Sequence, residues 1–498
     1  MLLELSIPHV IAPVLGNSIA IWSAMILMSV GGLSIGYFIG GYLASTKKLT
    51  HPIHVVFTSG VILLAICLIL ISIQNWIGFG IDEQFSAYLI VALSLFFPSV
   101  IFGTLPPLLI SEGKNSNKNI VGDVFFYSTI GGVLFTLVTG YFFIPRFGLL
   151  LTLSFGLIIL LLGLFSLERK HPVLAKKKWI IGLFVLFAIG FGNLYKYETN
   201  PEVEILYFSE GLNGQLLVAQ TPTEKILFIN RMGQTRVYRE NGASVWTYPY
   251  FIKSLASIQP PQSKSLVLGL GGGIVPMDLQ GPDINHIVTA VEIDSKIIHV
   301  ANEYFGLNSS TVDVIEEDGR RFINKTIETY DLIVVDVFNG EIAPSHVLSK
   351  EAFQRLKKIL SSNGFVVVNF NGFLNHIEGV STRSLIKTIR SAGFHLKICP
   401  TLEEGESHRN NIIIAYLKEP DWSSAQVPIM FNERACRVGI EFPFYNEKNI
   451  QGMEAHVITD DKPLMEDLNK YAAKKWRAEY LKDYTLKYRD EWSVPLIK

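Results

Sequence analysis

The feature that most constrains this chain is a series of long uncharged apolar runs within its first 195 residues. A helix needs about 20 consecutive apolar residues to cross a bilayer. Five runs have about that length, and a sixth is shorter but begins at Trp179 and ends at Tyr195, side chains that favour a membrane interface. We therefore predict about six spans, near 19–43, 52–73, 86–110, 122–144, 147–167 and 179–195.

Charged residues are distributed unevenly along the 498 positions. The first 195 residues carry 16 Asp, Glu, Lys and Arg, whereas the remaining 303 carry 71, an ordinary share for a soluble domain. This split excludes a wholly soluble enzyme, a disordered chain and a protein confined to the membrane. A net charge of −1 argues against a nucleic-acid partner, and three cysteines without metal-ligand spacing indicate neither a disulfide scaffold nor a metal site.

Basic residues between the apolar runs indicate an orientation. Lysines follow the first, third and fifth runs, and cytoplasmic loops are the ones that carry an excess of Lys and Arg. If 179–195 crosses the membrane, the polar part of the chain lies outside. If that segment enters the membrane without crossing, the polar part is cytoplasmic. The lysines concerned are Lys47, Lys48, Lys114, Lys118 and Lys176 to Lys178.

Glycines and prolines distinguish two of the apolar runs. Small residues four apart allow helices to pack closely, so the glycines of the first run predict helix packing. The prolines of the third run predict a kinked or broken helix, which can also line a binding site. These residues are Gly31, Gly32, Gly36, Gly40 and Gly41 in the first run, and Pro98, Pro106 and Pro107 in the third.

Beyond residue 200 the pattern becomes that of a soluble α/β protein. Short strands are predicted at 203–208, 215–220 and 225–230, followed by a helix around 243–257, which together form a small β-rich subdomain. Strands then alternate with helices, which is typical of a parallel, doubly wound sheet. The strands are predicted at 265–270, 287–293, 312–315, 332–335, 364–370 and 410–417, and the helices at 295–304 and 350–360.

The predicted organisation therefore has four parts. They are an α-helical transmembrane bundle (1–195), a small β-rich subdomain (200–262), a Rossmann-like α/β domain (263–420) and a C-terminal helical extension (421–498).

Several motifs follow predicted strands of the α/β domain, where ligands of such sheets bind. A glycine turn follows the first strand, Glu292 ends the second, Asp318-Gly319 follows the third and Asp336 follows the fourth. Glycines let the backbone approach a ligand, and an acid at the end of the second strand can accept hydrogen bonds from ribose hydroxyls. The order predicts a nucleoside site; a nucleotide-type fold with a decayed site is the alternative. The turn glycines are Gly269, Gly271, Gly272 and Gly273.

The glycine turn also narrows the choice of nucleoside ligand. It lacks the Gly-Lys-Ser/Thr of a phosphate-binding loop, and Ile274 and Pro276 break the dinucleotide-binding order. An adenosyl-sulfonium ligand is therefore favoured over NAD.

At these residues the chain resembles spermidine synthases, aminopropyltransferases with a class I methyltransferase-like fold. Residues 205–420 carry the resemblance, and the whole chain looks like the membrane-fused branch called fused transporter/spermidine synthase proteins. The shared segments include Ala12-Pro13, Trp22, Gly269 to Gly273, Val291 to Asp294, Asp318-Gly319, Tyr330 to Phe338, Pro344, His346, Leu348 and Thr459 to Asp461.

The resemblance implies a role for each matching residue. Glu292 would hold the ribose and Asp318 the adenine of decarboxylated S-adenosylmethionine or S-adenosylmethionine, with no metal. Asp336 would be the acid beside the reacting amine, and His346 is either a second base or a loop histidine with a structural hydrogen bond. The substrate-facing candidates are Gln234, Asn339 and Glu341.

The chain departs from the family where the amine should bind. Soluble spermidine synthases have Asp where this chain has Ile274, and a second Asp where it has Asn339, with Glu341 close by. Their Tyr-His-Glu stretch corresponds here to Tyr248-Pro249-Tyr250. Binding removes water from a dicationic substrate, and fewer carboxylates around it offset less of that free-energy cost. The nucleoside site is thus better preserved than the amine site.

Three functions are compatible with these observations. The first is a membrane-bound aminopropyltransferase acting on a small amine, with the lipid bilayer as partner and a homo-oligomer left open. The second is an S-adenosylmethionine-dependent methyltransferase. The third is a transporter or sensor with a non-catalytic ligand-binding domain. We expect a multi-pass protein of the cell (inner) membrane, with the polar part in the cytoplasm, where adenosyl-sulfonium compounds are made.

Overall fold

The computed structural model divides into two compact units, which are described separately. The N-terminal unit holds residues 1–201 with 208–216, and the C-terminal unit holds 202–207 with 217–486. The finer boundaries predicted at 262 and 420 remain predictions. The residues that the structure describes are 3–8, 19–46, 51–74, 89, 91–113, 120–168, 175–194, 202–211, 214–230, 232–338, 343–401, 410–422, 429–431, 434–436 and 444–483.

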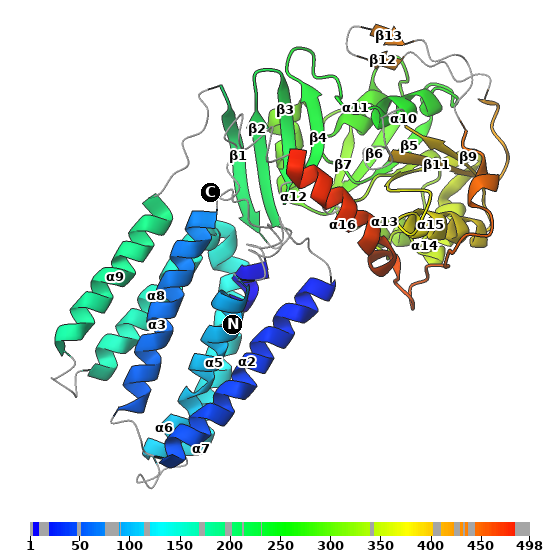
Figure 1. Ribbon diagram of the computed structural model, residues 1–498. Helices are drawn as coiled ribbons and strands as arrows, with labels where there is room; N and C mark the ends of the chain where they lie inside the picture. The colour runs from blue at the N-terminus through cyan, green and yellow to red at the C-terminus, as the bar shows by residue number, and fades with distance from the viewer. Residues whose placement is uncertain are drawn as a thin grey trace. The chain divides into compact units, whose positions relative to one another are not determined.

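Within the described ranges up to residue 194, the N-terminal unit is helical except at His51 and Thr104 (Figure 1). Four helical stretches are long and apolar enough to span a membrane: Trp22–Thr46, Pro52–Ile71, Ala92–Gly113 and Ile120–Ser166. A shorter apolar helix covers Trp179–Gly190. The elements are α2 (Ile19–Thr46), α3 (Pro52–Gln74), η1 (Ala92–Phe96), α5 (Phe97–Gly103), α6 (Leu105–Gly113), α7 (Ile120–Val138), η2 (Thr139–Phe143), α8 (Ile144–Glu168) and α9 (Ala175–Leu194).

Two interruptions shape these helices. The third predicted span is divided at Thr104, between α5 and α6, next to the prolines that predicted a break. The 47-residue stretch from Ile120 contains Gly148 with φ 75° and ψ 178°, so it consists of two helical parts. Two separate spans, near 122–144 and 147–167, were predicted over this stretch. Only glycine adopts such backbone angles readily, which explains why the helix bends there.

The glycines of α2 bring helix backbones into contact. A Cβ atom on Gly36 would lie 2.4 Å from the carbonyl oxygen of Val100, and one on Gly40 would lie 2.5 Å from that of Thr104. These contacts join α2 to α5 and the turn that follows it. They confirm the packing role predicted for this stripe, whereas Gly31 and Gly41 have no neighbour within 4 Å of such an atom.

A four-stranded sheet precedes the α/β domain, in the order β1-β2-β3-β4. The prediction of three strands missed β4, because its polar residues interrupt the apolar alternation. β4 pairs antiparallel with β3, with Glu224 opposite Tyr238. Its neighbour in the chain, α10, begins at Tyr248 rather than near 243, since Pro249 favours the first helical turn. The bounds are β1 (Glu204–Gly211), β2 (Gly214–Gln220), β3 (Glu224–Ile229), β4 (Met232–Tyr238) and α10 (Tyr248–Ala256).

The α/β domain is built on a seven-stranded sheet in the order β10-β11-β9-β8-β5-β6-β7. Strands β9, β8, β5, β6 and β7 are parallel, which confirms the predicted doubly wound fold. β11 is antiparallel to both of its neighbours, β9 and β10, and β10 forms the edge of the sheet on that side. The bounds are β5 (Lys264–Leu268), β6 (Ile287–Glu292), β7 (Asp313–Glu316), β8 (Tyr330–Val335), β9 (Leu360–Asn371), β10 (His395–Pro400) and β11 (Asn410–Tyr416).

Helices alternate with these strands along the chain and cover the sheet. Buried residues of α14 and α15 pack with β8 and β9 in one hydrophobic core, which Met465 and Leu468 of α16 also join. The prediction included α12 and α14 but omitted α11, α13 and α15. The bounds are α11 (Ile274–Gln280), α12 (Ser295–Phe305), α13 (Gly319–Lys325), α14 (Lys350–Ile359), α15 (Val380–Ser391) and α16 (Met465–Asp483), with a two-stranded β12 (Ile429–Phe431) and β13 (Arg434–Cys436).

Candidate active site

Backbone hydrogen bonds hold the carboxyl ends of the central strands together. Gly269 N–H donates to Val291 O at 2.9 Å, and Asp336 N–H donates to Leu268 O at 2.9 Å. The ends of β5, β6 and β8 therefore meet at one edge of the sheet. Strand order reverses on either side of β5, and such switch points are where ligands of doubly wound sheets bind.

The glycine turn after β5 is shaped by its close neighbours. A Cβ atom on Gly269, where φ is 91°, would lie 2.1 Å from the carbonyl oxygen of Asp336. Gly272 N–H donates to Thr235 Oγ1 at 2.8 Å, and a Cβ atom on Gly272 would lie 2.7 Å from Thr235 Cγ2. The turn is thus packed between β8 and β4. Thr235 was not among the predicted site residues.

Glu292 joins the glycine turn to the end of β6. One carboxylate oxygen accepts a hydrogen bond from Leu270 N–H and the other from Asp294 N–H, both at 3.0 Å. The side chain is buried, and burial raises the pKa of this carboxyl while the two backbone donors oppose the rise. Each oxygen of a carboxylate has two acceptor positions, so Glu292 retains the capacity to accept from ligand hydroxyls.

Asp318 and His346 contact each other rather than standing apart. Asp318 caps α13, accepting from Arg321 N–H at 2.8 Å, and its other oxygen lies 3.1 Å from His346 Nε2. Gly319, which follows, is the first residue of α13. His346 therefore contacts Asp318, the predicted adenine-binding acid, and the roles of both residues stay predictions.

The backbone beside His346 is fixed by a charged network. Arg320 donates to His346 O at 2.8 Å and forms an ion pair with Asp460 at 2.7 Å. Ser349 Oγ also donates to Asp460, at 2.6 Å. Asp460 belongs to the Thr459 to Asp461 segment noted in the sequence, and its role here is to tie that segment to the site.

The carboxylate of Asp336 accepts hydrogen bonds from two side chains. Asn369 Nδ2 donates to Asp336 Oδ1 at 2.8 Å, and the Tyr248 hydroxyl also hydrogen-bonds to this carboxylate. Burial raises the pKa of Asp336 to about 6, against the lowering effect of those two hydrogen bonds. The pKa of Tyr248 is raised well above its usual value by burial and by the neighbouring Asp336 charge. Tyr248 therefore acts as a hydrogen-bond donor.

Asn369 is held in the orientation that suits Asp336. Its Oδ1 accepts from Asn410 Nδ2 at 2.7 Å, so its amide nitrogen must face the carboxylate. Neither asparagine was predicted as a site residue. A polar residue within the apolar strand 365–370 was the available signal, since buried polar groups are hydrogen-bonded to something specific.

The predicted substrate-facing residues are only partly visible. Gln234 lies on β4, and its carbonyl oxygen is 3.9 Å from the position that a Cβ atom on Gly271 would take. Asn339 and Glu341 lie outside the described residues. Ile274, where the resemblance expected an acid, is the first residue of α11. Among the described residues, no group of three or more His, Cys, Asp and Glu is placed to hold a metal ion.

Comparison with known proteins identifies the domain. Residues 252–405 match the family model described as the spermine/spermidine synthase domain. The C-terminal unit carries a spermidine synthase-like domain. The segment matched by the family model contains the glycine turn, Glu292, Asp318, Asp336 and Asn369.

Individual relatives of the spermidine synthase-like domain are distant. A polyamine aminopropyltransferase of Vibrio vulnificus is 33% identical over 142 residues, which cover 27% of this chain and less than half (48%) of that protein. Polyamine aminopropyltransferase 2 of Aquifex aeolicus is 24% identical over 412 residues, covering 79% of this chain and 80% of that one. The structure of a probable spermidine synthase from Corynebacterium glutamicum matches with a TM-score of 0.39 at 17% identity. The match covers 53% of this chain and 96% of that one.

The hydrogen bond that Asn369 donates to Asp336 predicts how the activity of the spermidine synthase-like domain depends on pH. Asp336 accepts protons as pH falls through about 6, so activity that needs its charge should fall there. Asn369→Ala removes a donor that favours the charged form, which raises the pKa. We expect the acidic limb of the kcat/KM profile to move upward by about one pH unit.

A matched variant tests the assignment of that limb. Asp278, on α11, also has its pKa raised to about 6 by burial, yet no contact connects it to Asp336 within the described residues. Asp278→Asn should leave the limb in place. An unchanged limb in Asn369→Ala, or a shifted one in Asp278→Asn, would contradict the assignment to Asp336.

Proposed function

We propose that the chain is a membrane-bound aminopropyltransferase that moves an aminopropyl group from decarboxylated S-adenosylmethionine to an amine. The observation that carries the proposal is Asp336, whose carboxylate is held by Tyr248 and Asn369 directly beside the glycine turn. Relatives named polyamine aminopropyltransferase support this reading.

The nucleoside end of the co-substrate would be held by two acids. Glu292 would accept from the ribose hydroxyls with the acceptor positions that its backbone donors leave, and Asp318 would face the adenine amino group. The bare Cα atoms of the glycine turn allow close approach of the ligand. His346, bound to Asp318, would position that acid rather than accept a proton from the amine.

The reaction requires a neutral amine and a proton acceptor. The amine lone pair attacks the carbon next to the sulfonium, so a C–N bond forms as the C–S bond breaks and its electrons neutralise the sulfur. Methylthioadenosine leaves as a thioether, and the excess proton of the new ammonium goes to Asp336. With a pKa of about 6, Asp336 is mostly ionised at pH 7, and its pKa is close enough to that pH for efficient proton acceptance. The anion also attracts a cationic substrate.

Methyl transfer is the second candidate. Ile274 stands where the resemblance expects an amine-binding Asp, and this loss favours an acceptor or donor different from those of soluble spermidine synthases. The same acids would then bind S-adenosylmethionine, and the product would be S-adenosylhomocysteine.

The proposed location is a multi-pass position in the cell membrane, with the spermidine synthase-like domain in the cytoplasm. Four stretches of spanning length and hydropathy support the membrane, and the supply of adenosyl-sulfonium compounds supports the side. A reporter enzyme that is active only in the periplasm, fused after Lys498, tests which side of the membrane the domain occupies. Activity of this reporter would contradict a cytoplasmic domain.

One product analysis tests the reaction. The purified full-length protein is incubated with putrescine and decarboxylated S-adenosylmethionine, and in parallel with S-adenosylmethionine. We expect methylthioadenosine in the first reaction and much less of it with Glu292→Gln, which places an amide N–H2 against a backbone donor. S-Adenosylhomocysteine in the second reaction would instead establish methyl transfer. Neither product, together with no nucleoside binding by calorimetry, would leave the domain without either activity.

A further inference from the structure

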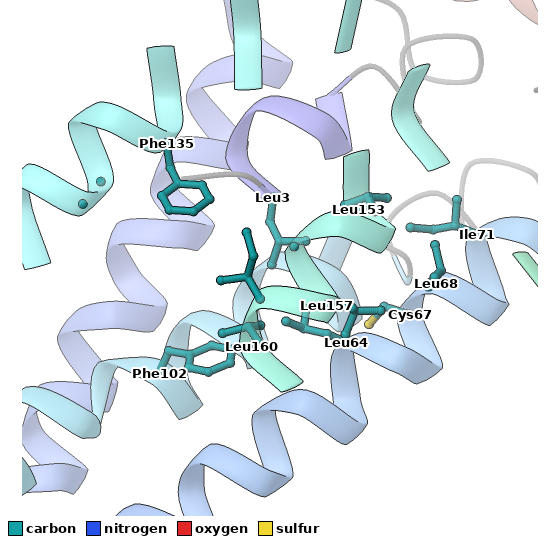
Figure 2. A pocket seen from close by; sticks show the side chains of 14 residues that line it. Leu3, Leu64, Cys67, Leu68, Ile71, Phe102, Phe135, Leu153, Leu157 and Leu160 are labelled. Atoms are coloured by element: carbon teal, nitrogen blue, oxygen red, sulfur yellow. The ribbon is translucent and has the colours of Figure 1, made fainter. Parts of the chain in front are cut away.

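A cavity of about 380 Å³ lies among the helices of the N-terminal unit (Figure 2). Residues of α3, α5, α7 and α8 line it, together with Leu3 of the helical segment 3–8. Figure 2 shows Phe102 and Phe135 on one side, and Leu64, Cys67 and Leu68 on another. This volume is within the range of about 300–1,000 Å³ typical of ligand pockets.

The chemistry of the lining is almost purely hydrocarbon. Among the described residues that line the cavity, none has a charged side chain, and Cys67 is the one whose side chain carries a heteroatom. The Cys67 thiol is directed to a backbone partner, donating to Leu93 O at 3.2 Å. Apolar cavities of even about 150 Å³ stay dry and take up apolar molecules. The described lining does not suit a polyamine, since none of these residues would compensate a buried ammonium group.

Glycines open the cavity on the side of α7. Gly131 and Gly132 of α7 and Gly156 of α8 contribute no side chain, and a Cβ atom on Gly131 would have no neighbour within 4 Å. No residue of α7 is buried, and Val133 and Leu134 are exposed. This helix is therefore loosely packed in its unit.

We propose that this cavity holds an acyl chain of a membrane lipid. The inference rests on the proposed membrane location but not on the proposed reaction. Acyl chains are the most abundant apolar groups in a bilayer, and a chain in the cavity would supply the contacts that its hydrocarbon lining lacks when empty. The lipid is bound by its tail, because none of the described lining residues has a group that would recognise a headgroup.

Photocrosslinking of the full-length protein tests this proposal. The protein is reconstituted with phosphatidylcholine that carries a diazirine on one acyl chain, and labelled peptides are mapped by mass spectrometry. We expect labelling of the cavity residues Leu64, Leu68 and Leu157, and also of Phe126 and Tyr127, which are 62% and 70% exposed on α7. Gly131→Leu should lower cavity labelling at least about tenfold, because its side chain occupies the space of several methylene groups.

Two further variants make the result decisive. Leu160→Trp fills the cavity from α8 and should produce the same loss, which guards against misfolding of the first variant. Gly190→Leu on α9 is the matched control: a Cβ atom there also has no neighbour within 4 Å, but Gly190 does not line the cavity. Cavity labelling should be unchanged in this control.

The outcomes separate the cavity from the membrane location. Labelling of Phe126 and Tyr127 without cavity labelling would overturn the acyl-chain proposal and leave the membrane location intact. Cavity labelling that persists in both filled variants would overturn it as well. Absence of labelling at every position would overturn the membrane location and the acyl-chain site together, while the aminopropyl reaction would remain testable by its products.

Discussion

Asp336→Asn is expected to lower kcat/KM by about 10²- to 10⁴-fold, the range that a positioned general base contributes. The amide cannot accept the proton released by the amine, and it no longer offers a negative charge to a cationic acceptor. Steady-state kinetics on the full-length protein measure the loss. Calorimetric binding of methylthioadenosine should be little changed, because Glu292 and Asp318 are untouched.

The same variant should be more stable than the wild type at high pH. Burial raises the pKa of Asp336 from 3.8 to about 6. Above pH 6 the buried charge therefore lowers the free energy of unfolding, and below pH 4 the carboxyl is neutral in both the folded and the unfolded state, so this cost disappears. The shift corresponds to about 3 kcal/mol at most. Hydrogen exchange in β8 should therefore slow in Asp336→Asn at pH 8, with the difference disappearing near pH 4. A variant that kept full activity, or was destabilised at pH 8, would contradict the assigned role.

Gly269→Ala is expected to disrupt the sheet edge, with a cost of more than about 3 kcal/mol. Two effects add at this position. The φ of 91° disfavours any residue with a Cβ atom, and that atom would lie 2.1 Å from the backbone oxygen of Asp336. Because backbone cannot rotate away as a side chain can, β5 and β8 must separate. Hydrogen exchange of peptides covering both strands in the full-length protein measures the effect, and nucleoside binding should be lost with it.

Gly306→Ala is the matched control for this experiment. Gly306 ends α12 with φ 83°, but a Cβ atom there has no neighbour within 4 Å. Its replacement therefore carries the backbone strain alone, about 1–2 kcal/mol. Equal effects of the two substitutions would show that the contact between the glycine turn and Asp336 contributes nothing.

Local patterns were sufficient for the framework of the molecule. The apolar runs, the change near residue 200 and the alternation of strands and helices each depend on nearby residues, so periodicity and length reveal them. Elements with mixed polarity or short length escaped, as β4 and α11 show. The start of α10 was misplaced because the position of Pro249 outweighed the apolar pattern before it.

The acids of the candidate site could be predicted because parallel strands present their carboxyl ends at one edge. The glycine turn, Asp318 and Asp336 each follow a strand, and Glu292 ends one. That placement can be read from the chain. Their roles in catalysis remain predictions. The residues that orient Asp336 could not be read from the chain in this way. Asn369, which donates to Asp336, and Asn410, which donates to Asn369, lie 33 and 74 positions beyond Asp336 in the sequence.

The sequence by itself determined that an apolar helical half is joined to a doubly wound α/β half, and that acids end the central strands. The tertiary structure decided what each acid contacts. It placed His346 against Asp318, Tyr248 and Asn369 against Asp336, and Thr235 against the glycine turn. The physical reason is that hydrogen bonding and burial depend on distances in space between residues far apart in the chain. These surroundings set the pKa of Asp336, and no local pattern encodes them.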